Sequence, residues 1–201
     1  MSADDWDARY AHPNHVYGYR PNDFLAANER MLRRGSRVLC LGDGEGRNGV
    51  WLATRGHDVV SLDFSRTGLD KAEALAAEKG VEIGTWHVDL ADWVGLPPPG
   101  RPWDAVVAIF LHLPPALRRA VARTATAQCG RGAVLLLEAY TPAQLALGTG
   151  GPKDEELLVT RADVVDDWAG WHLDVRLVER RIFEGMGHQG LGSVVQVLGK
   201  R

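Results

Sequence analysis

The chain has 201 residues, of which 24% are charged, and its 23 basic and 26 acidic side chains give a formal net charge of −3. This length suits one domain with a sizeable core, and the near balance of charge excludes the broad basic field that drives nucleic-acid binding. The acidic start lacks the order of a signal peptide, and the apolar runs are too short to span a membrane. We therefore expect a cytoplasmic protein whose partner is a small molecule, with no nucleic acid and no membrane.

The first 35 residues do not fit a strand pattern. They are rich in aromatic side chains and end in the helix-like segment "NDFLAANERMLRR". We expect residues 1–35 to form a cap over the ligand side of the domain.

Residues 36–140 alternate apolar segments of strand length with segments of helical periodicity. The predicted strands are Arg37–Leu41, Asp58–Asp63, Glu82–Asp89, Ala105–Phe110 and Ala133–Tyr140. The predicted helices are Asn48–Arg55, Thr67–Lys79 and Pro115–Gln128. This alternation is typical of an α/β fold, in which helices cover both faces of a parallel sheet.

Residues 141–201 end differently, because "LDVRLVERRIFEG" and "GSVVQVLGK" alternate like antiparallel strands on either side of the glycine-rich "MGHQGLG". A hairpin at one sheet edge is expected, which makes the sheet mixed. The cap, the central core and this C-terminal region then form a single domain over residues 1–201.

A glycine turn follows the first predicted strand and leads into a helix, the arrangement that holds nucleotide cofactors. Residues 44–49 also fit the dinucleotide pattern G-x-G-x-x-G, although the match is weak by itself. Asp43 and Glu45 lie within the turn, and their negative charge disfavours the phosphates of NAD. S-adenosylmethionine has no phosphate and carries positive charge, so it tolerates an acidic turn.

Further acidic residues end the next two strands. Asp63 is placed to accept hydrogen bonds from both ribose hydroxyls, and Asp89 from the adenine amino group, while Leu90 packs on the ring. An aspartate at a strand end is also a common helix cap or turn residue. The succession of such residues after consecutive strands favours the cofactor interpretation.

The segment "VLCLGDGEGRNGVWLATRGHDVVSLDFSRTGLDKA" resembles motifs I and II of class I S-adenosylmethionine-dependent methyltransferases, in the "GEGRN" version of the tellurite-resistance methyltransferase group. Further segments similar to that group are "YGYRPNDFL", "IFLHLPPALR", "GTGGPKDEELL" and "EGMGHQG". The resemblance implies a Rossmann-like sandwich with a mixed, mostly parallel seven-stranded sheet and a C-terminal antiparallel hairpin. It also implies S-adenosyl-L-methionine as cofactor and S-adenosyl-L-homocysteine as product.

The cofactor contacts expected on this basis are Tyr17, Gly42, Asp43, Gly44, Gly46, Arg47, Asn48, Asp63, Phe64, Asp89, Leu90 and Phe110. One position departs from the family, because Cys40 replaces the acid that usually stands two residues before the first glycine. Asp43 or backbone carbonyls are the expected substitutes for binding the methionine ammonium.

His112, Tyr140 and His188 are the candidate catalytic residues, because each follows or faces a strand end near the expected methyl position. Tyr17 and Arg20 are candidates for closing the cavity from the cap. Each of these side chains has an alternative role in packing or in hydrogen bonding a turn. A thiol or chalcogen acceptor, as the resemblance implies, would ionise readily and need little help from a base.

Three functions remain open from the sequence: a small-molecule methyltransferase, a nicotinamide-dependent oxidoreductase, and a non-catalytic S-adenosylmethionine-binding protein. The protein is expected to be a monomer or a homodimer. Cys40 and Cys129 have neither paired spacing nor an obvious partner, so we expect both to be reduced and structural. The histidines are scattered, and no metal site is expected.

Overall fold

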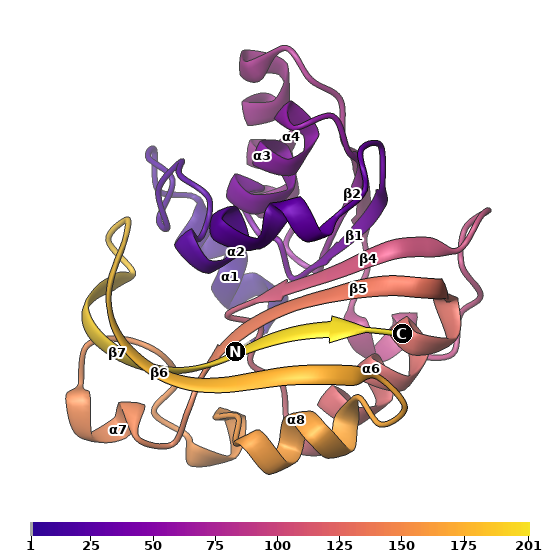
Figure 1. The fold of residues 1–201 in the computed structure, drawn as a ribbon. Coiled ribbons are helices and arrows are strands. Elements are labelled where there is room, and N and C mark those ends of the chain that lie inside the picture. Colours follow the sequence, from indigo (N-terminus) through magenta and orange to yellow (C-terminus); the bar gives the residue numbers. More distant parts are fainter. Residues whose placement is uncertain (1) are drawn as a thin grey trace.

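The computed structural model describes residues 2–201 and contains a seven-stranded sheet in the order β3-β2-β1-β4-β5-β7-β6 (Figure 1). The strands are β1 (Arg37–Leu41), β2 (Asp58–Asp63), β3 (Gly84–His87), β4 (Trp103–Ile109), β5 (Cys129–Tyr140), β6 (His172–Glu184) and β7 (His188–Lys200). Strands β1 to β5 are parallel, whereas β7 pairs antiparallel with both β5 and β6. This is the mixed Rossmann-like sheet predicted from the sequence.

Helices connect the parallel strands and precede the sheet. The helices are α1 (Ala3–Tyr10), α2 (Asp23–Asn28), α3 (Arg47–Thr54), α4 (Arg66–Lys79), α5 (Leu90–Trp93), α6 (Pro115–Gln128), α7 (Gln144–Leu147) and α8 (Arg161–Asp167), with short 3₁₀ turns η1 (Glu29–Met31) and η2 (Glu155–Leu157). Among residues 2–201, no helix has both the length and the apolar character that a membrane crossing requires.

Most predicted boundaries agree with the structure, and β1, β2 and α6 match at both ends. The third strand is shorter than the predicted Glu82–Asp89. It ends at His87 because Asp89 leaves the strand and caps α5, where its carboxylate accepts a hydrogen bond from the Ala91 N–H at 2.8 Å. Strand β5 begins at Cys129, earlier than predicted, since Cys129 pairs with Trp103 across a register irregularity.

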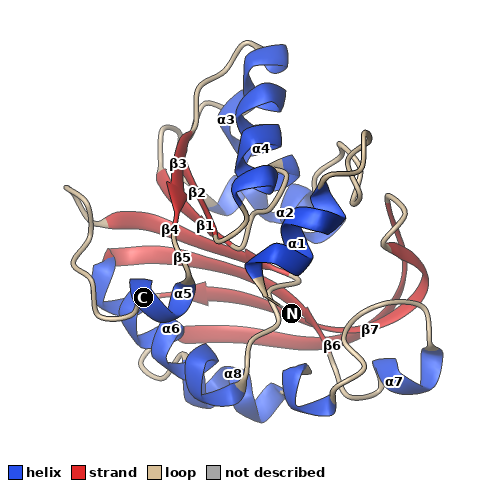
Figure 2. Ribbon diagram, turned by 180° about the vertical axis from the view of Figure 1, so that it is seen from behind, coloured by secondary structure: helices blue, strands red, loops and turns tan. Residues whose placement is uncertain are grey.

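Strand β1 shows why the sheet is buried on both faces. Leu39 and Leu41 point into the core beneath α5, α6 and α8, while Val38 and Cys40 point into the core against α2 and α3. Figure 2 shows the two groups of helices on opposite sides of the sheet. A continuous apolar strand is the pattern expected when a parallel strand packs against helices on both faces.

The C-terminal hairpin places β7 inside the sheet and β6 at its edge. The predicted separator "MGHQGLG" is not a loop throughout, because β7 already begins at His188 and the connection is only Gly185–Gly187. Position 192 of β7 requires a glycine, because a Cβ there would come 2.4 Å from the Ile182 side chain across the ladder. The strand pair therefore extends well beyond the end of β5, and its turn lies beside the loop that follows α1 (Figure 1).

Candidate functional site

The carboxyl ends of β1 to β5 share one edge of the sheet, as parallel strands require. The strand order reverses between β1 and β4, so the connections that leave these two neighbours run in opposite directions. Ligands of open α/β sheets bind at such a reversal point, outside the carboxyl ends of the strands. The loop Gly42–Gly46 after β1 and the segment Phe110–His112 after β4 flank this point.

The glycine loop has the backbone that its sequence predicts. Gly42, Gly44 and Gly46 have positive φ angles of 61°, 54° and 80°, and Gly46 directly precedes α3. A Cβ on Gly44 would lie 2.4 Å from the hydroxyl oxygen of Tyr10, and one on Gly46 would meet Ala72 at the same distance. Glycine is therefore required both for the left-handed turns and for the close approach of neighbouring atoms.

Asp63 ends β2 and is only 6% exposed. Its two carboxylate oxygens accept hydrogen bonds from the N–H groups of Gly44 and Ser65, each at 2.8 Å. Burial raises the pKa of Asp63 to about 6, and no lysine or arginine in residues 2–201 forms an ion pair with it. A carboxylate offers about four acceptor positions, so Asp63 retains capacity for the donors of a ligand.

The two acids of the glycine loop point away from the ligand side. Asp43 accepts from the Ser61 hydroxyl at 2.6 Å and from the Gly49 N–H at 3.2 Å, which ties the loop to β2 and α3. Glu45 accepts from the Val16 N–H at 2.8 Å and pairs with Lys71 at 2.8 Å. The acids therefore shape the loop and anchor the cap, and the repulsion argument against a dinucleotide loses part of its basis.

Arg47 and Asn48 begin α3 but contact the cap and the hairpin. Arg47 forms a buried ion pair with Glu184 at 2.6 Å, and Asn48 accepts from the Asn22 N–H at 2.9 Å. The Asn22 amide in turn donates to Glu138 at 2.8 Å and to Glu184 at 2.9 Å. These contacts hold the cap, α3, β5 and β6 together beside the glycine loop, so a cofactor contact for Arg47 or Asn48 stays a prediction.

The predicted adenine contacts lie at the far end of the same edge. Asp89 is exposed and serves as the α5 cap, while Leu90 is buried in the core beneath the sheet. Phe64, which follows Asp63 directly, is half-buried and its carbonyl lies 3.0 Å from a ring nitrogen of His87. Phe64 thus lies at the carboxyl end of β2, and Asp89 and Leu90 follow the carboxyl end of β3.

The structure brings the three catalytic candidates together. The ring of Tyr140 stacks on His112, with centroids 5.7 Å apart, and meets His188 edge-on at 5.4 Å. Phe110 directly follows β4, and its ring centroid lies 4.7 Å from that of Tyr140. Its backbone φ of 53° is the one positive value among the non-glycine residues 2–201. Tyr17 of the cap closes the cluster, 4.7 Å from His188. Strained backbone of this kind is concentrated at functional sites.

His112 is held in one tautomer. Its Nδ1 lies 3.0 Å from the Leu157 carbonyl oxygen, which can only accept, so Nδ1 carries the hydrogen and Nε2 has a free lone pair. That Nε2 is shielded from solvent and has no hydrogen-bond partner among the described residues. Burial lowers the pKa of His112 to about 4, and the imidazole is therefore neutral at physiological pH.

His188 lies next to an acid that stays ionised. Its Nδ1 is 3.5 Å from an oxygen of Glu184. Burial alone would raise the pKa of Glu184, but the contacts with His188 and Arg47 outweigh it and hold the pKa at about 2. Burial also raises the pKa of the Tyr140 phenol, so that group stays protonated.

Several residues near the site were not predicted. Tyr10 of α1 covers Gly44 and Gly68, and Asp7 accepts from the Ser65 hydroxyl and from the Thr67 N–H at 3.0 Å. The cap position itself was predicted, but no sequence signal indicates which cap side chain meets which loop. Arg20 is exposed, and its carbonyl oxygen accepts from Arg47 at 3.3 Å.

The comparisons with known proteins agree with this geometry. A methyltransferase domain family model matches residues 38–136. The 2-heptyl-1-hydroxyquinolin-4(1H)-one methyltransferase of Mycobacteroides abscessus is 29% identical over 137 residues, which make up 65% of this chain and 60% of that protein. The chain thus matches less than two thirds of that relative's length.

Solved structures share the fold over most of the chain. A structure reported for the conversion of a disulfide bond into a thioacetal group during echinomycin biosynthesis superposes with a TM-score of 0.77 at 20% identity, covering 100% of this chain and 92% of the other. TehB from Haemophilus influenzae superposes with a TM-score of 0.66 at 16% identity, covering 89% of this chain and 61% of the other. These likenesses establish the fold.

This seven-stranded sheet, with a glycine loop after β1 and an acid ending β2, has the Rossmann-like fold that solved S-adenosylmethionine-dependent methyltransferases share with this chain. Residues 38–136 match a methyltransferase domain, and the predicted resemblance of the chain to class I S-adenosylmethionine-dependent methyltransferases is confirmed. Another neighbour of this fold, the magnesium protoporphyrin IX methyltransferase of Synechocystis PCC 6803, has been solved with S-adenosylmethionine and with S-adenosylhomocysteine bound.

The described residues fit this cofactor. Asp63 is a buried carboxylate with free acceptor capacity and no cationic partner, which suits the two hydroxyl donors of a ribose. The glycine loop beside it presents backbone without side chains at Gly42 and Gly44. Asp63, the loop and the segment after β4 would thus hold the ribose and methionine parts of the cofactor.

We expect Asp43→Asn to lower the free energy of unfolding by about 1–3 kcal/mol, because the amide NH2 group replaces a carboxylate oxygen beside the Gly49 N–H and the Ser61 hydroxyl and so leaves a buried donor unpaired. Affinity for S-adenosylmethionine should fall or stay unchanged, and tight NAD binding should not appear. Thermal unfolding and calorimetric titration measure these effects, with the exposed Asp92→Asn as control. A gain in S-adenosylmethionine affinity would contradict the role given to Asp43.

Proposed function

We propose that this chain transfers the methyl group of S-adenosylmethionine to a small-molecule acceptor. The observation that carries the proposal is the buried, uncompensated Asp63 beside a glycine loop at the reversal point of the sheet. Bound S-adenosylmethionine supplies a methyl group already activated by its sulfonium. The protein then has to align an acceptor with that methyl and exclude water, which the cap and the aromatic cluster are placed to do.

The proposed roles follow the strand ends. The backbone of the glycine loop, which Asp43 holds in place through Ser61 and Gly49, would bind the methionine part, Asp63 and Phe64 the ribose, and Asp89 and Leu90 the adenine. On the acceptor side, His112, Tyr140 and His188 form the wall after β4 and β5, with Tyr17 and Phe110 closing it. The cap, the core and the C-terminal region act together as one methyltransferase domain in this proposal.

A thiol or chalcogen species is the acceptor class that we propose. The available base, His112, has a pKa of about 4, so it is suited to an acceptor that already ionises near neutral pH. The neighbour involved in turning a disulfide into a thioacetal is a sulfur-processing precedent on the same fold. We place the protein in the cytoplasm, where its two free, buried cysteines would stay reduced.

A calorimetric titration with S-adenosylmethionine, S-adenosylhomocysteine and NADH tests the cofactor part of this proposal. Binding of the first two and not the third is expected; binding of NADH alone would favour a nicotinamide-dependent oxidoreductase. A methyl-transfer screen over thiols, selenium and tellurium oxyanions and a hydroxyquinolone then tests turnover and acceptor class. Binding without transfer to any acceptor would favour a non-catalytic cofactor-binding protein.

The affinity for S-adenosylmethionine should depend on pH through Asp63. Its folded-state pKa is raised to about 6, so the carboxylate that accepts the ribose hydroxyls is lost below that pH. We expect affinity to be constant above pH 6 and to fall by up to about tenfold per pH unit below it. Titrations between about pH 5 and 8 measure this, and Asp63→Asn should remove the slope.

The raised pKa of Asp63 affects the stability of the ligand-free protein in the opposite direction. Because the folded pKa lies above the unfolded value of 3.8, ionised Asp63 destabilises the fold at neutral pH, and this penalty disappears as the pH falls from 6 toward 3.8. A cofactor affinity that rises on acidification would contradict the role of the ionised carboxylate.

A further inference from the structure

Strand β6 forms an open edge of the sheet. It has 13 residues and pairs only with β7. The carbonyl oxygen of Val175 accepts from Arg161 at 3.0 Å and that of Arg181 from Arg180 at 3.5 Å, so both point away from β7. Backbone groups alternate in direction along an antiparallel strand, so the N–H and C=O groups of the odd-numbered residues of β6 point to the open edge of the sheet. Within residues 2–201, no group beyond the β6–β7 ladder bonds to the backbone of Leu177, Glu179 or Phe183.

The side chains of these edge residues share one face and are largely exposed. Val175 packs into the core on this face, but beyond it Leu177 is 61% exposed and Phe183 is 72% exposed. Glu179 and Arg181 lie between them and are also exposed, and neither forms an ion pair among the described residues. The order along the edge is thus apolar, acidic, basic, apolar at every second residue.

This order is complementary to itself in the antiparallel direction. We propose that a second copy of this chain pairs with the β6 edge, about a twofold axis through Arg180. Leu177 then lies opposite Phe183 of the second copy, and Glu179 lies opposite Arg181, with both pairs repeated by the symmetry. A twofold interface uses the same patch on both copies, and apolar and opposite-charge pairs across antiparallel strands are stabilising.

Other registers lose this complementarity. A shift by two residues places either Glu179 opposite Glu179 or Arg181 opposite Arg181, and like charges directly opposite each other are destabilising. A shift by one residue places outward backbone groups opposite inward ones, so the ladder cannot form. Arg180 meets its own copy at the centre, but its charge is compensated by Glu138, with contacts of 2.7 and 3.0 Å.

The dimer would join the two sheets and cover an edge that is otherwise open to non-specific pairing. It would also bury part of an apolar surface that is concentrated on this hairpin. The exposed large hydrophobic residues there are Leu177, Phe183, Met186 and Leu191. The charge pattern and the apolar exposure therefore point to the same occupant.

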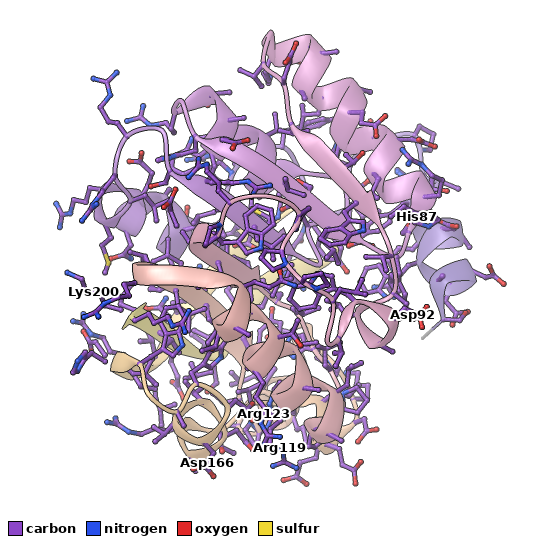
Figure 3. All side chains as sticks on the ribbon, turned by 90° about the vertical axis from the view of Figure 1, so that its right-hand side faces the viewer. His87, Asp92, Arg119, Arg123, Asp166 and Lys200 are labelled. Atoms are coloured by element: carbon purple, nitrogen blue, oxygen red, sulfur yellow. The ribbon has the colours of Figure 1, made fainter. Side chains whose placement is uncertain are left out.

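Sedimentation analysis of the full chain tests the proposal by charge exchange. We expect a wild-type dimer, and each of Glu179→Arg and Arg181→Glu should raise its dissociation constant by about tenfold or more, because each creates two like-charge pairs. The double variant should restore the wild-type constant to within about threefold. Lys200→Glu is the control for the charge change, since Lys200 is exposed at the other end of the hairpin (Figure 3).

A disulfide experiment tests the register. Directly opposed residues of an outward pair have Cα atoms about 5.5 Å apart, within disulfide range. Mixing Leu177→Cys with Phe183→Cys under oxidising conditions should therefore give a cross-linked pair, whereas neither variant alone should cross-link. A wild-type monomer throughout the concentration range, a dimer insensitive to both charge reversals, or a double variant that stays dissociated would each overturn the proposal.

Discussion

Replacement of Asp63 by alanine should weaken S-adenosylmethionine binding by roughly 2 to 4 kcal/mol, or about 30- to 1000-fold. The reason is that Asp63 is buried at the end of β2, and in the proposed function its remaining acceptor positions would bind the cofactor ribose. The variant loses a charge-assisted pair of hydrogen bonds that no neighbouring side chain can supply. Calorimetric titration of the folded variant gives the affinity directly.

A structural loss has to be separated from this effect, because Asp63 also accepts from the N–H groups of Gly44 and Ser65. Asp63→Asn keeps one acceptor oxygen and should unfold closer to the wild-type temperature than the alanine variant, while still binding S-adenosylmethionine weakly. The exposed Asp92→Ala provides the matched control. Unchanged affinity in either folded Asp63 variant would remove this residue from the proposed cofactor site.

Removal of the His112 imidazole should lower the methyl-transfer rate by about 10- to 100-fold for a weakly acidic acceptor at neutral pH, at the low end of general-base contributions, because its lowered pKa makes it a weaker base than a free imidazole. Its Nδ1 is fixed on the Leu157 carbonyl, and its shielded Nε2 has the free lone pair that a base needs. Cofactor affinity should be nearly intact, because His112 follows β4 on the proposed acceptor side. A thiol acceptor that ionises by itself should lose much less rate.

The measurement is single-turnover transfer from saturating S-adenosylmethionine to two acceptors of different pKa, with wild type and His112→Ala. Packing of His112 on Tyr140 is the alternative role, and its loss would not discriminate between the acceptors. Equal, small losses for both would therefore defeat the base assignment. They would indicate a preionised nucleophile that the fold aligns without activating.

The local elements of the core were predictable from the sequence because their signals are local. Strands β1 and β2 match their predicted bounds, since short apolar segments between a turn and a helix leave little choice of state. The left-handed turns at Gly42, Gly44 and Gly46 follow from glycine itself. The resemblance in the same segment predicted the Rossmann-like sheet and the proposed cofactor.

The directions of side chains around the site were decided by the tertiary structure. From the sequence, Asp43 and Glu45 are two acids beside a ligand; in the fold, each turns away to a hydroxyl, an amide or a lysine that lies on another element. Asp89 caps α5 and is exposed. A residue's position along a strand gives the sheet edge where it lies, but its hydrogen-bond partners depend on which elements pack there.

The sequence by itself thus predicted the fold class, the strand ends beside the candidate site and the three candidate catalytic residues that the structure groups there. Only the tertiary structure decided that β7 enters the sheet between β5 and β6, which exposes the β6 edge. It also joined Asn22 to Glu138 and Glu184, 116 and 162 residues further along the chain. Such contacts leave no periodic signal in the sequence, because they form between distant segments only after the strands have taken their order in the sheet.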